Sequence, residues 1–320
     1  MRALVLESEG KMPELKEVPK PEFGKTDVLV KVSAAGVNYA DTMMRRGFYL
    51  QKPAFPFIPG FEFSGVVEAA GPAVKHVKPG DRVMGTGAQT YAEYTVARAG
   101  AVMRSPAKFT DEQAAAFPVV YMTAMGMLRI SACARGGETI LVHAAAGGVG
   151  TASIQLAKHL GLHVIATAGT NEKLEVASRL GADVTINYRE EDFVEPVLDA
   201  TRGRGADIIF ESIGGDFLER DIRAAAPFGR IVVFGMASGR AEPPDIGAMF
   251  RNSVSVSAFW LMTLLAHSER LAPIIRELLD LVEKGTITPV IGRVYPLEKG
   301  AEALEALEAR RTIGKLLLKP

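Results

Sequence analysis

The stretch from Ile140 to Lys158, ILVHAAAGGVGTASIQLAK, constrains the fold of this chain more than any other. An apolar run of strand type stops at a burst of alanine and glycine, and a helical pattern begins at once. The first N–H groups of such a helix attract anions, and small residues let a pyrophosphate approach the backbone. The spacing Ala144-x-x-Gly147-x-x-Gly150 varies the dinucleotide fingerprint G-x-G-x-x-G. The stretch therefore predicts a dinucleotide-binding turn, although a tight turn without a ligand fits the same residues.

The chain around this turn, from about Met122 to Trp260, alternates strand patterns with helical patterns. Strands are expected at 139–144, 163–168, 183–188, 207–212, 230–235 and 253–260, with helices at 151–160, 171–181, 191–201 and 217–226. Such alternation is typical of βαβ units and of a parallel sheet covered on both faces. We therefore predict an α/β, doubly wound (Rossmann) domain over residues 122–262.

The first 120 residues lack this alternation. Short strand patterns at 28–38, 63–71 and 81–87 are separated by glycine, proline and aspartate, which favours a compact β-rich domain. The segment 263–320 shows helices at 268–284 and 297–311 and strands at 292–297 and 315–319. Because the alternating domain is complete before it, we expect this segment to return to the β-rich domain formed by residues 1–121.

Composition narrows the class of protein. The 37 basic and 37 acidic residues cancel, which argues against nucleic acid as a partner. The single cysteine, Cys133, forms no internal disulfide and no multi-cysteine zinc site. The first ten residues do not resemble a signal peptide, and the weakly polar run 254–266 is too short to span a bilayer. We expect a cytoplasmic protein without a membrane partner.

The end of the second strand bears on which dinucleotide binds. NAD sites usually carry an acidic residue there, bonded to the ribose 2′-hydroxyl, but residues 166–170 read ATAGT. Lys173 follows within one helical turn, and Tyr188 and Arg189 close the next strand at the same edge. These side chains favour a 2′-phosphate and hence NADPH, although Lys173 and Arg189 are also interpretable as ordinary solvated charges. The cofactor residues expected from the two turns are Ala146, Gly147, Gly148, Val149, Gly169, Thr170, Lys173, Tyr188 and Arg189.

A set of motifs along the whole chain resembles the medium-chain dehydrogenase/reductase superfamily, and within it the zinc-independent quinone oxidoreductases. The motifs are AAGVNYAD, IPGFEFSG, PGDRV, YAEY, HAAAGGVG, AGTNEK, INYR and GKLLL. The resemblance implies a GroES-like catalytic domain beside the Rossmann domain. It also implies a reductase that transfers hydride from NADPH to quinones or to α,β-unsaturated carbonyl compounds.

The resemblance also bears on metal. Zinc alcohol dehydrogenases of the superfamily carry a cysteine and a histidine where this chain has Asn38 and Phe61, which leaves Glu62 alone. The stretch 84–94 runs through the region of the four-cysteine structural lobe without a cysteine. Because catalytic zinc needs about three protein ligands, the resemblance implies chemistry without a metal.

Further site residues are implied by the resemblance alone. Those at the substrate are Asn38, Asp41, Tyr49 and Thr123. Those along the cofactor are Ile213, Gly214, Phe234, Gly235, Phe259 and Lys315. Tyr49 is interpretable as a proton donor or as an edge aromatic, and Thr123 as a residue under the nicotinamide or as a helix hydroxyl.

Two alternatives to a quinone reductase stay open. One is a 2-enoyl-thioester reductase, for which Arg45 and Arg46 could supply a basic mouth. The other is an NADPH-binding protein without turnover. We also expect a homodimer, because the stretch 253–260 would form the outer strand of the sheet and relatives pair there.

Overall fold

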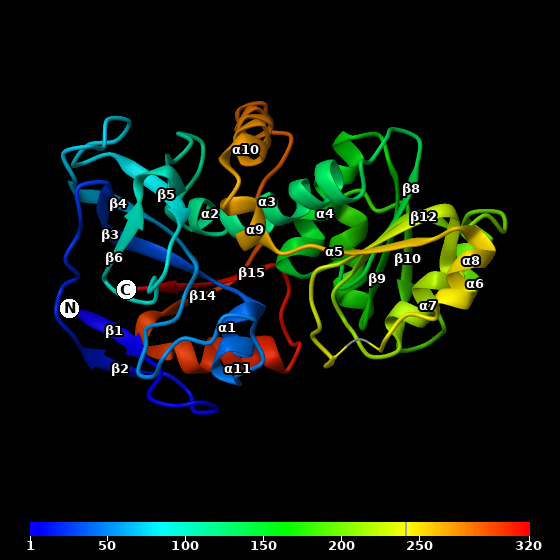
Figure 1. The fold of residues 1–320 in the computed structure, drawn as a ribbon, viewed down its shortest axis with the longest axis horizontal. Helices are drawn as coiled ribbons and strands as arrows, with labels where there is room; N and C mark the ends of the chain where they lie inside the picture. The colour runs from blue at the N-terminus through cyan, green and yellow to red at the C-terminus, as the bar shows by residue number, and fades with distance from the viewer. Residues whose placement is uncertain (241) are drawn as a thin grey trace. The chain divides into compact units, whose positions relative to one another are not determined.

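The computed structural model describes residues 1–240 and 242–320, which divide into two compact units (Figure 1). The first unit contains Met1–Val119 and Thr288–Pro320, and the second contains Val120–Ile287. The second unit is therefore one continuous stretch of chain, and the first is completed by its last 33 residues.

The second unit is built on a six-stranded sheet in the order β10-β9-β8-β11-β12-β13, and all neighbours run parallel. Its strands are β8 (Thr139–Val142), β9 (His163–Ala168), β10 (Val184–Asn187), β11 (Ala206–Glu211), β12 (Ala225–Val233) and β13 (Ser255–Ala258). The strand order reverses between β8 and β11, which is where doubly wound sheets bind ligands. The predicted Rossmann fold is confirmed.

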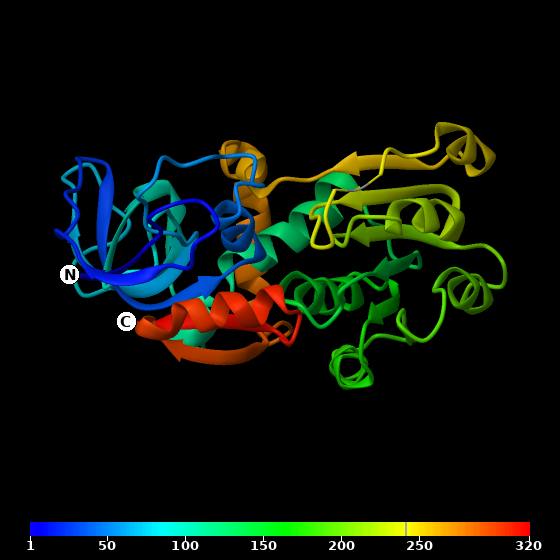
Figure 2. The same ribbon diagram turned by 90° about the horizontal axis from the view of Figure 1, so that it is seen from below.

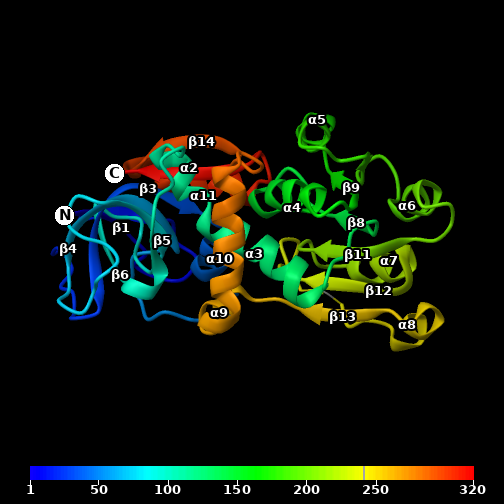
Figure 3. The same cartoon turned by 90° about the horizontal axis from the view of Figure 1, so that it is seen from above.

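Helices cover both faces of this sheet, with α4 on one side and α6 and α7 on the other (Figure 3). The α-helices in the described residues of this part of the chain are α3 (Pro118–Gly126), α4 (Gly148–His159), α5 (Asn171–Arg179), α6 (Val194–Ala200), α7 (Phe217–Ala224), α8 (Ile246–Asn252), α9 (Leu261–Leu265) and α10 (Ser268–Glu283). Strand side chains such as Leu141, Ile165 and Ile209 are fully buried beneath them. Within residues 1–240 and 242–320, no helix is both long and apolar enough to cross a membrane.

The first unit is β-rich, as predicted, with a seven-stranded sheet and a separate hairpin of β1 (Arg2–Val5) and β2 (Glu14–Glu17). The sheet contains β3 (Asp27–Val37), β4 (Glu62–Ala70), β5 (Arg82–Thr86), β6 (Tyr94–Arg98), β7 (Val102–Arg104), β14 (Ile291–Pro296) and β15 (Lys315–Lys319). Three helices complete it: α1 (Tyr39–Arg45), α2 (Asp111–Ala115) and α11 (Gly300–Glu308).

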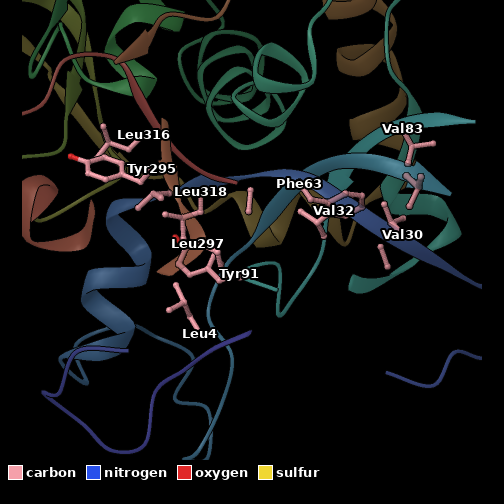
Figure 4. Close-up of a cluster of buried hydrophobic side chains, with 14 of the residues drawn as sticks. Leu4, Val30, Val32, Phe63, Val83, Tyr91, Tyr295, Leu297, Leu316 and Leu318 are labelled. Atoms are coloured by element: carbon pink, nitrogen blue, oxygen red, sulfur yellow. The ribbon is translucent and has the colours of Figure 1, made fainter. Parts of the chain in front are cut away.

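The core of the first unit draws on both ends of the chain. Figure 4 shows Leu4 and Phe63 in the same apolar cluster as Leu316 and Leu318, and all four are buried. Strand β15 pairs parallel with β14 and antiparallel with β3, and α11 lies alongside β15 (Figure 2). The segment Thr288–Pro320 thus supplies strands of the first unit's sheet and part of its core.

The return begins later than we expected. We assigned residues 263–320 to it, but the chain through Ile287 belongs to the second unit, which begins at Val120. The reason is packing, because α10 contacts α9, and Nε of Arg129 donates to a carboxylate oxygen of Glu277 at 3.1 Å. Helix α10 spans Ser268–Glu283, where a helix was expected at 268–284, and its residues cluster with the second unit.

Candidate functional site

The glycine-rich turn joins β8 to α4. Helix α4 begins at Gly148, and its N-cap residue, Gly147, has an extended backbone and no side chain. A Cβ atom on Gly150 would lie 2.5 Å from the carbonyl oxygen of Ala144 and 2.7 Å from Cα of Ala145, so only glycine fits there. The first N–H groups of a 12-residue helix therefore point toward a turn of small residues. This is the backbone geometry that binding a pyrophosphate requires.

A second corner of small residues follows β9. A Cβ atom on Gly169 would lie 3.0 Å from Nε of Arg189 and 3.1 Å from the hydroxyl oxygen of Tyr188. The N–H of Tyr188 donates to the carbonyl of Ala168 at 3.2 Å, which joins the ends of β9 and β10. Lys173 lies in the first turn of α5, directly beyond Gly169 and Thr170. A guanidinium and a phenol thus border a strand end without a carboxylate, and this donor set fits a phosphate.

The end of β11 is a third corner at the same edge of the sheet. The carboxylate of Glu211 accepts the N–H groups of Ile213 and Gly214, at 2.5 and 3.1 Å. The N–H of Phe234 donates to the carbonyl of Glu211 at 2.9 Å, and a Cβ atom on Gly235 would come within 3.1 Å of this segment. The structure therefore brings these four expected cofactor residues together around Glu211, which the sequence analysis missed.

Phe259 and Thr123 both belong to the second unit. The N–H of Phe259 donates to the carbonyl of Val233 at 2.9 Å, which places Phe259 directly after β13. Its ring would lie 2.7 Å from a Cβ atom on Gly126, in the same helix as Thr123. Thr123 itself is 7% exposed within α3, which suits either interpretation of its hydroxyl.

A buried polar triad lies in the first unit. Nζ of Lys315 lies 2.6 Å from Oε1 of Glu62 and donates to Oδ1 of Asn38 at 2.5 Å. The Asn38 amide donates to the same Glu62 oxygen at 2.9 Å, and Oε2 of Glu62 accepts the N–H of Val119 at 2.8 Å. Glu62 and Lys315 are 0% and 4% exposed. Lys315, expected along the cofactor, thus has its ammonium directed at Glu62 and Asn38.

One member of the triad, Asn38, stands where the resemblance places the metal-binding cysteine of zinc relatives, and Phe61 stands where it places their histidine. A carboxamide at 38 and a phenyl ring at 61 are poor ligands, and Lys315 neutralises Glu62. Among residues 1–240 and 242–320, no group of three or more histidine, cysteine, aspartate or glutamate side chains could hold a metal ion. The residues present therefore suit a buried ion pair and do not fit a zinc site.

Asp41, the third residue of α1, is the other buried carboxylate near this triad. Its Oδ2 accepts the N–H of Asn38 at 2.8 Å and the hydroxyl of Tyr91 at 2.6 Å, and its Oδ1 accepts the N–H of Gly60 at 3.2 Å. Burial outweighs these donors and the nearby Lys315 ammonium, and it raises the pKa of the Asp41 carboxyl to about 6. Burial also raises the pKa of Tyr91 well above its ordinary value, and Asp41 adds to this. Through these bonds, Asp41 holds the start of α1 against Gly60 and Tyr91.

Tyr49 lies beyond the end of α1, in a segment with exposed apolar side chains. Its ring packs 5.8 Å from the ring of Phe61, at a tilt of 54°. Its neighbours Phe48 and Leu50 are 67% and 75% exposed. Both interpretations of Tyr49, a proton donor and an edge aromatic, are compatible with this half-buried position.

Arg45 does not supply a basic mouth. Its guanidinium lies 2.6 Å from Oε1 of Glu308 on α11 and also donates to the carbonyl of Gly10. Arg46 lies over the ring of Phe48, 5.2 Å from its centroid. The pairing of Arg45 removes one of the two charges that favoured a phosphate-bearing thioester.

The sequence analysis missed Glu62 and Tyr91 as members of the site. Both are fully buried, and each bonds to a residue that the analysis did select. The available signal was a glutamate inside the apolar strand pattern FEFSGVV, since a buried charge needs a partner.

Comparisons with known proteins agree with this architecture. The family model described as alcohol dehydrogenase GroES-like domain matches residues 24–107, and the one described as zinc-binding dehydrogenase matches residues 148–283. A quinone oxidoreductase of Pseudomonas aeruginosa is 37% identical over 96% of this chain and 95% of its own. One from Sus scrofa is 36% identical over 94% and 91%. The crystal structure of Escherichia coli quinone oxidoreductase complexed with NADPH superposes with a TM-score of 0.94, at 33% identity over 100% of both chains.

Proposed function

The chain belongs to the zinc-independent quinone oxidoreductases of the medium-chain dehydrogenase/reductase superfamily, and on that premise we propose that it is an NADPH-dependent reductase. Its electron acceptor is a quinone or another carbonyl compound conjugated to a double bond. The observation that carries the proposal is the corner after β9, where Tyr188 and Arg189 border Gly169. A typical NAD site has there an acidic residue that would repel a 2′-phosphate.

Three segments of the second unit bind the cofactor in this proposal. The N–H groups at the start of α4 hold the pyrophosphate, in the turn of residues Ala146, Gly147, Gly148 and Val149. The corner after β9 holds the 2′-phosphate, with Thr170 and Lys173 beside Tyr188 and Arg189. The ends of β11 and β12, with Phe259, line the rest of the cofactor.

The bound cofactor supplies the hydride, and the protein orients the acceptor and excludes water. Tyr49 donates a hydrogen bond to the carbonyl oxygen of the acceptor as negative charge develops there. Lys315 keeps Glu62 neutralised, so no unbalanced buried carboxylate opposes that charge. Asn38 and Asp41 act through the backbone and side chains that they hold, and Thr123 orients the ring that donates the hydride.

Cofactor preference tests the proposal. One effective bond to a charged phosphate is worth about 1.5–3 kcal/mol, and partial exposure reduces it, so a preference of roughly tenfold for NADPH over NADH is expected. Lys173→Ala should raise the KM for NADPH and leave the KM for NADH unchanged. Arg179→Ala, at the other end of α5, is the control for loss of a positive charge. Equal kcat/KM with both cofactors in the parent protein would refute the phosphate site.

Acceptor specificity is tested separately. NADPH oxidation is followed with a panel of quinones, with simple α,β-unsaturated ketones and with 2-enoyl thioesters. Fast turnover of quinones or ketones supports the proposal, whereas turnover of thioesters alone would replace it with an enoyl-thioester reductase. NADPH binding without oxidation in any arm would indicate a cofactor-binding protein without turnover.

We also propose a homodimer in the cytoplasm. Among residues 1–240 and 242–320, β13 is the outer strand of its sheet, as expected for the stretch 253–260, and such an unpaired parallel edge favours association. Phe228 in β12 and Phe250 in α8 are 76% and 79% exposed on elements that neighbour this edge. Light scattering at micromolar concentration tests the dimer, and a monomeric mass would refute it.

A further inference from the structure

A chain of three buried polar side chains lies beneath the cofactor corners of the second unit. Nδ1 of His143 lies 2.7 Å from Oγ1 of Thr167, and Nε2 of His143 lies 2.7 Å from Oδ1 of Asp221. All three residues are at most 1% exposed. No residue of this chain of contacts can therefore touch a substrate, and its role must be internal.

The three side chains come from elements that carry the cofactor corners. His143 follows β8 and directly precedes the turn at Ala144, whose φ of 47° is unusual for alanine. Thr167 lies in β9, two residues before Gly169, and its carbonyl accepts the N–H of Ala145 at 3.0 Å. The contact between His143 and Thr167 therefore joins the pyrophosphate turn to the 2′-phosphate corner.

Both ring nitrogens of His143 have a polar partner, one on each side of the imidazole. The hydroxyl of Thr167 can donate or accept a hydrogen bond, so its contact with Nδ1 holds with either tautomer of the ring. The rings of Phe193 and Phe217 meet the imidazole edge-on, with centroids 4.7 and 5.2 Å away, and seal it from water. Each side chain is therefore held in a single orientation.

Burying these three polar side chains costs free energy of folding. Within the described residues, Oδ2 of Asp221 has no hydrogen-bond partner, and burial raises the pKa of the Asp221 carboxyl. Burial likewise raises the pKa of Glu211, the carboxylate that holds the third cofactor corner. Apolar side chains would fill this space at lower cost, so geometry rather than stability explains its polar character.

We propose that Thr167, His143 and Asp221 are positioning residues that fix the pyrophosphate turn and the 2′-phosphate corner relative to each other. This inference rests on the proposed NADPH site. It predicts that these three side chains increase the affinity for a ligand that spans both corners, and that they do not affect the affinity for a ligand that occupies a single corner. A purely structural role would affect both ligands alike or neither.

The test compares Thr167→Val, which replaces the hydroxyl with a methyl group of similar size, with Thr167→Ser, which retains the hydroxyl. Affinities for NADPH, which spans both corners, and for adenosine 2′-monophosphate, which occupies only the second, are measured by titration calorimetry well below the midpoint of thermal unfolding. Thr167→Val should weaken NADPH binding about fivefold to tenfold, the effect of one lost hydrogen bond, and leave the monophosphate within twofold of the parent protein. Thr167→Ser should bind both ligands like the parent.

Three outcomes would overturn the inference. Unchanged NADPH affinity in Thr167→Val, or an equal loss for both ligands, would show that the hydroxyl does not position the corners. If Thr167→Val does not fold, Thr167→Ala carries the same expectation with less bulk. If the parent protein binds neither ligand, the proposed function fails first, and the inference fails with it.

Discussion

Replacing Asp41 with asparagine should change how the stability of the protein depends on pH. The carboxyl group is completely buried, and its pKa is raised to about 6 from an ordinary value of 3.8. An acid with a raised pKa binds its proton more tightly in the folded state than in the unfolded state. The free energy of unfolding that it contributes is therefore highest below pH 4 and falls as the pH rises through 6. Asparagine cannot ionise and abolishes this dependence.

The size of the effect follows from the shift. Each pKa unit corresponds to 1.36 kcal/mol, so a shift of about two units corresponds to about 3 kcal/mol. Part of this amount is already lost at pH 4, so the stability of the parent protein relative to Asp41→Asn should decline by about 2 kcal/mol between pH 4 and pH 7. The bonds that the carboxylate accepts lower its pKa, but burial outweighs them, so the net pKa shift is upward and the expected decline remains.

Urea unfolding of both proteins at pH 4, 5, 6 and 7, followed by circular dichroism, measures the difference. Glu93→Gln is a control of opposite sign, because the N–H and guanidinium of Arg2 lower the pKa of Glu93. The advantage of the parent over that variant should grow with pH. If the advantage over Asp41→Asn also grows with pH, the hydrogen bonds dominate, and our account of this carboxyl is wrong.

Three further predictions concern the site. Lys315→Met should destabilise the protein by about 3–5 kcal/mol because Glu62 is left buried without its ammonium, and adding Glu62→Gln should return most of that loss in urea unfolding. A loss that the second substitution leaves untouched would mean that the ion pair is not the cause. Tyr49→Phe should lower kcat for activated alkenes about 100-fold or more and leave the affinity for NADPH unchanged. If this variant has the kcat of the parent protein, Tyr49 only lines the site and donates no proton. Chelators should leave steady-state activity unchanged, and stoichiometric zinc in elemental analysis would contradict the metal-free mechanism.

Most strands of the second unit could be predicted because buried parallel strands are continuous apolar runs between polar turns. Helix α4 begins at Gly148, three residues before the expected start. Glycine has a low helix propensity, so the sequence pattern did not indicate that Gly148 and Gly150 belong to the helix. Helix α8 was missed altogether. It has no buried residue, and Ile246 and Phe250 are exposed, so its sequence carries no core-facing periodicity.

The cofactor corners could be located from sequence because the carboxyl ends of parallel strands meet at one edge of a sheet. The partners of the buried charges could not be located. Lys315 and Asn38 are separated by 277 positions, and His143 and Asp221 by 78, so their contacts depend on the completed topology. Local pattern therefore identified which residues lie at strand ends, but not which side chains bond to each other.

The position of β15 has a consequence for synthesis on the ribosome. The second unit is one uninterrupted stretch, and it can fold as soon as it has emerged. Met1–Val119 emerges earlier but lacks β15, which lies between β14 and β3 in the sheet of the first unit, until the chain has been synthesised through Lys319. Until then residues 35–37 of β3 have no partner strand on the side opposite β4, and Glu62 has no Lys315 to neutralise it. The nascent first unit is thus the part of this protein that most needs protection from aggregation.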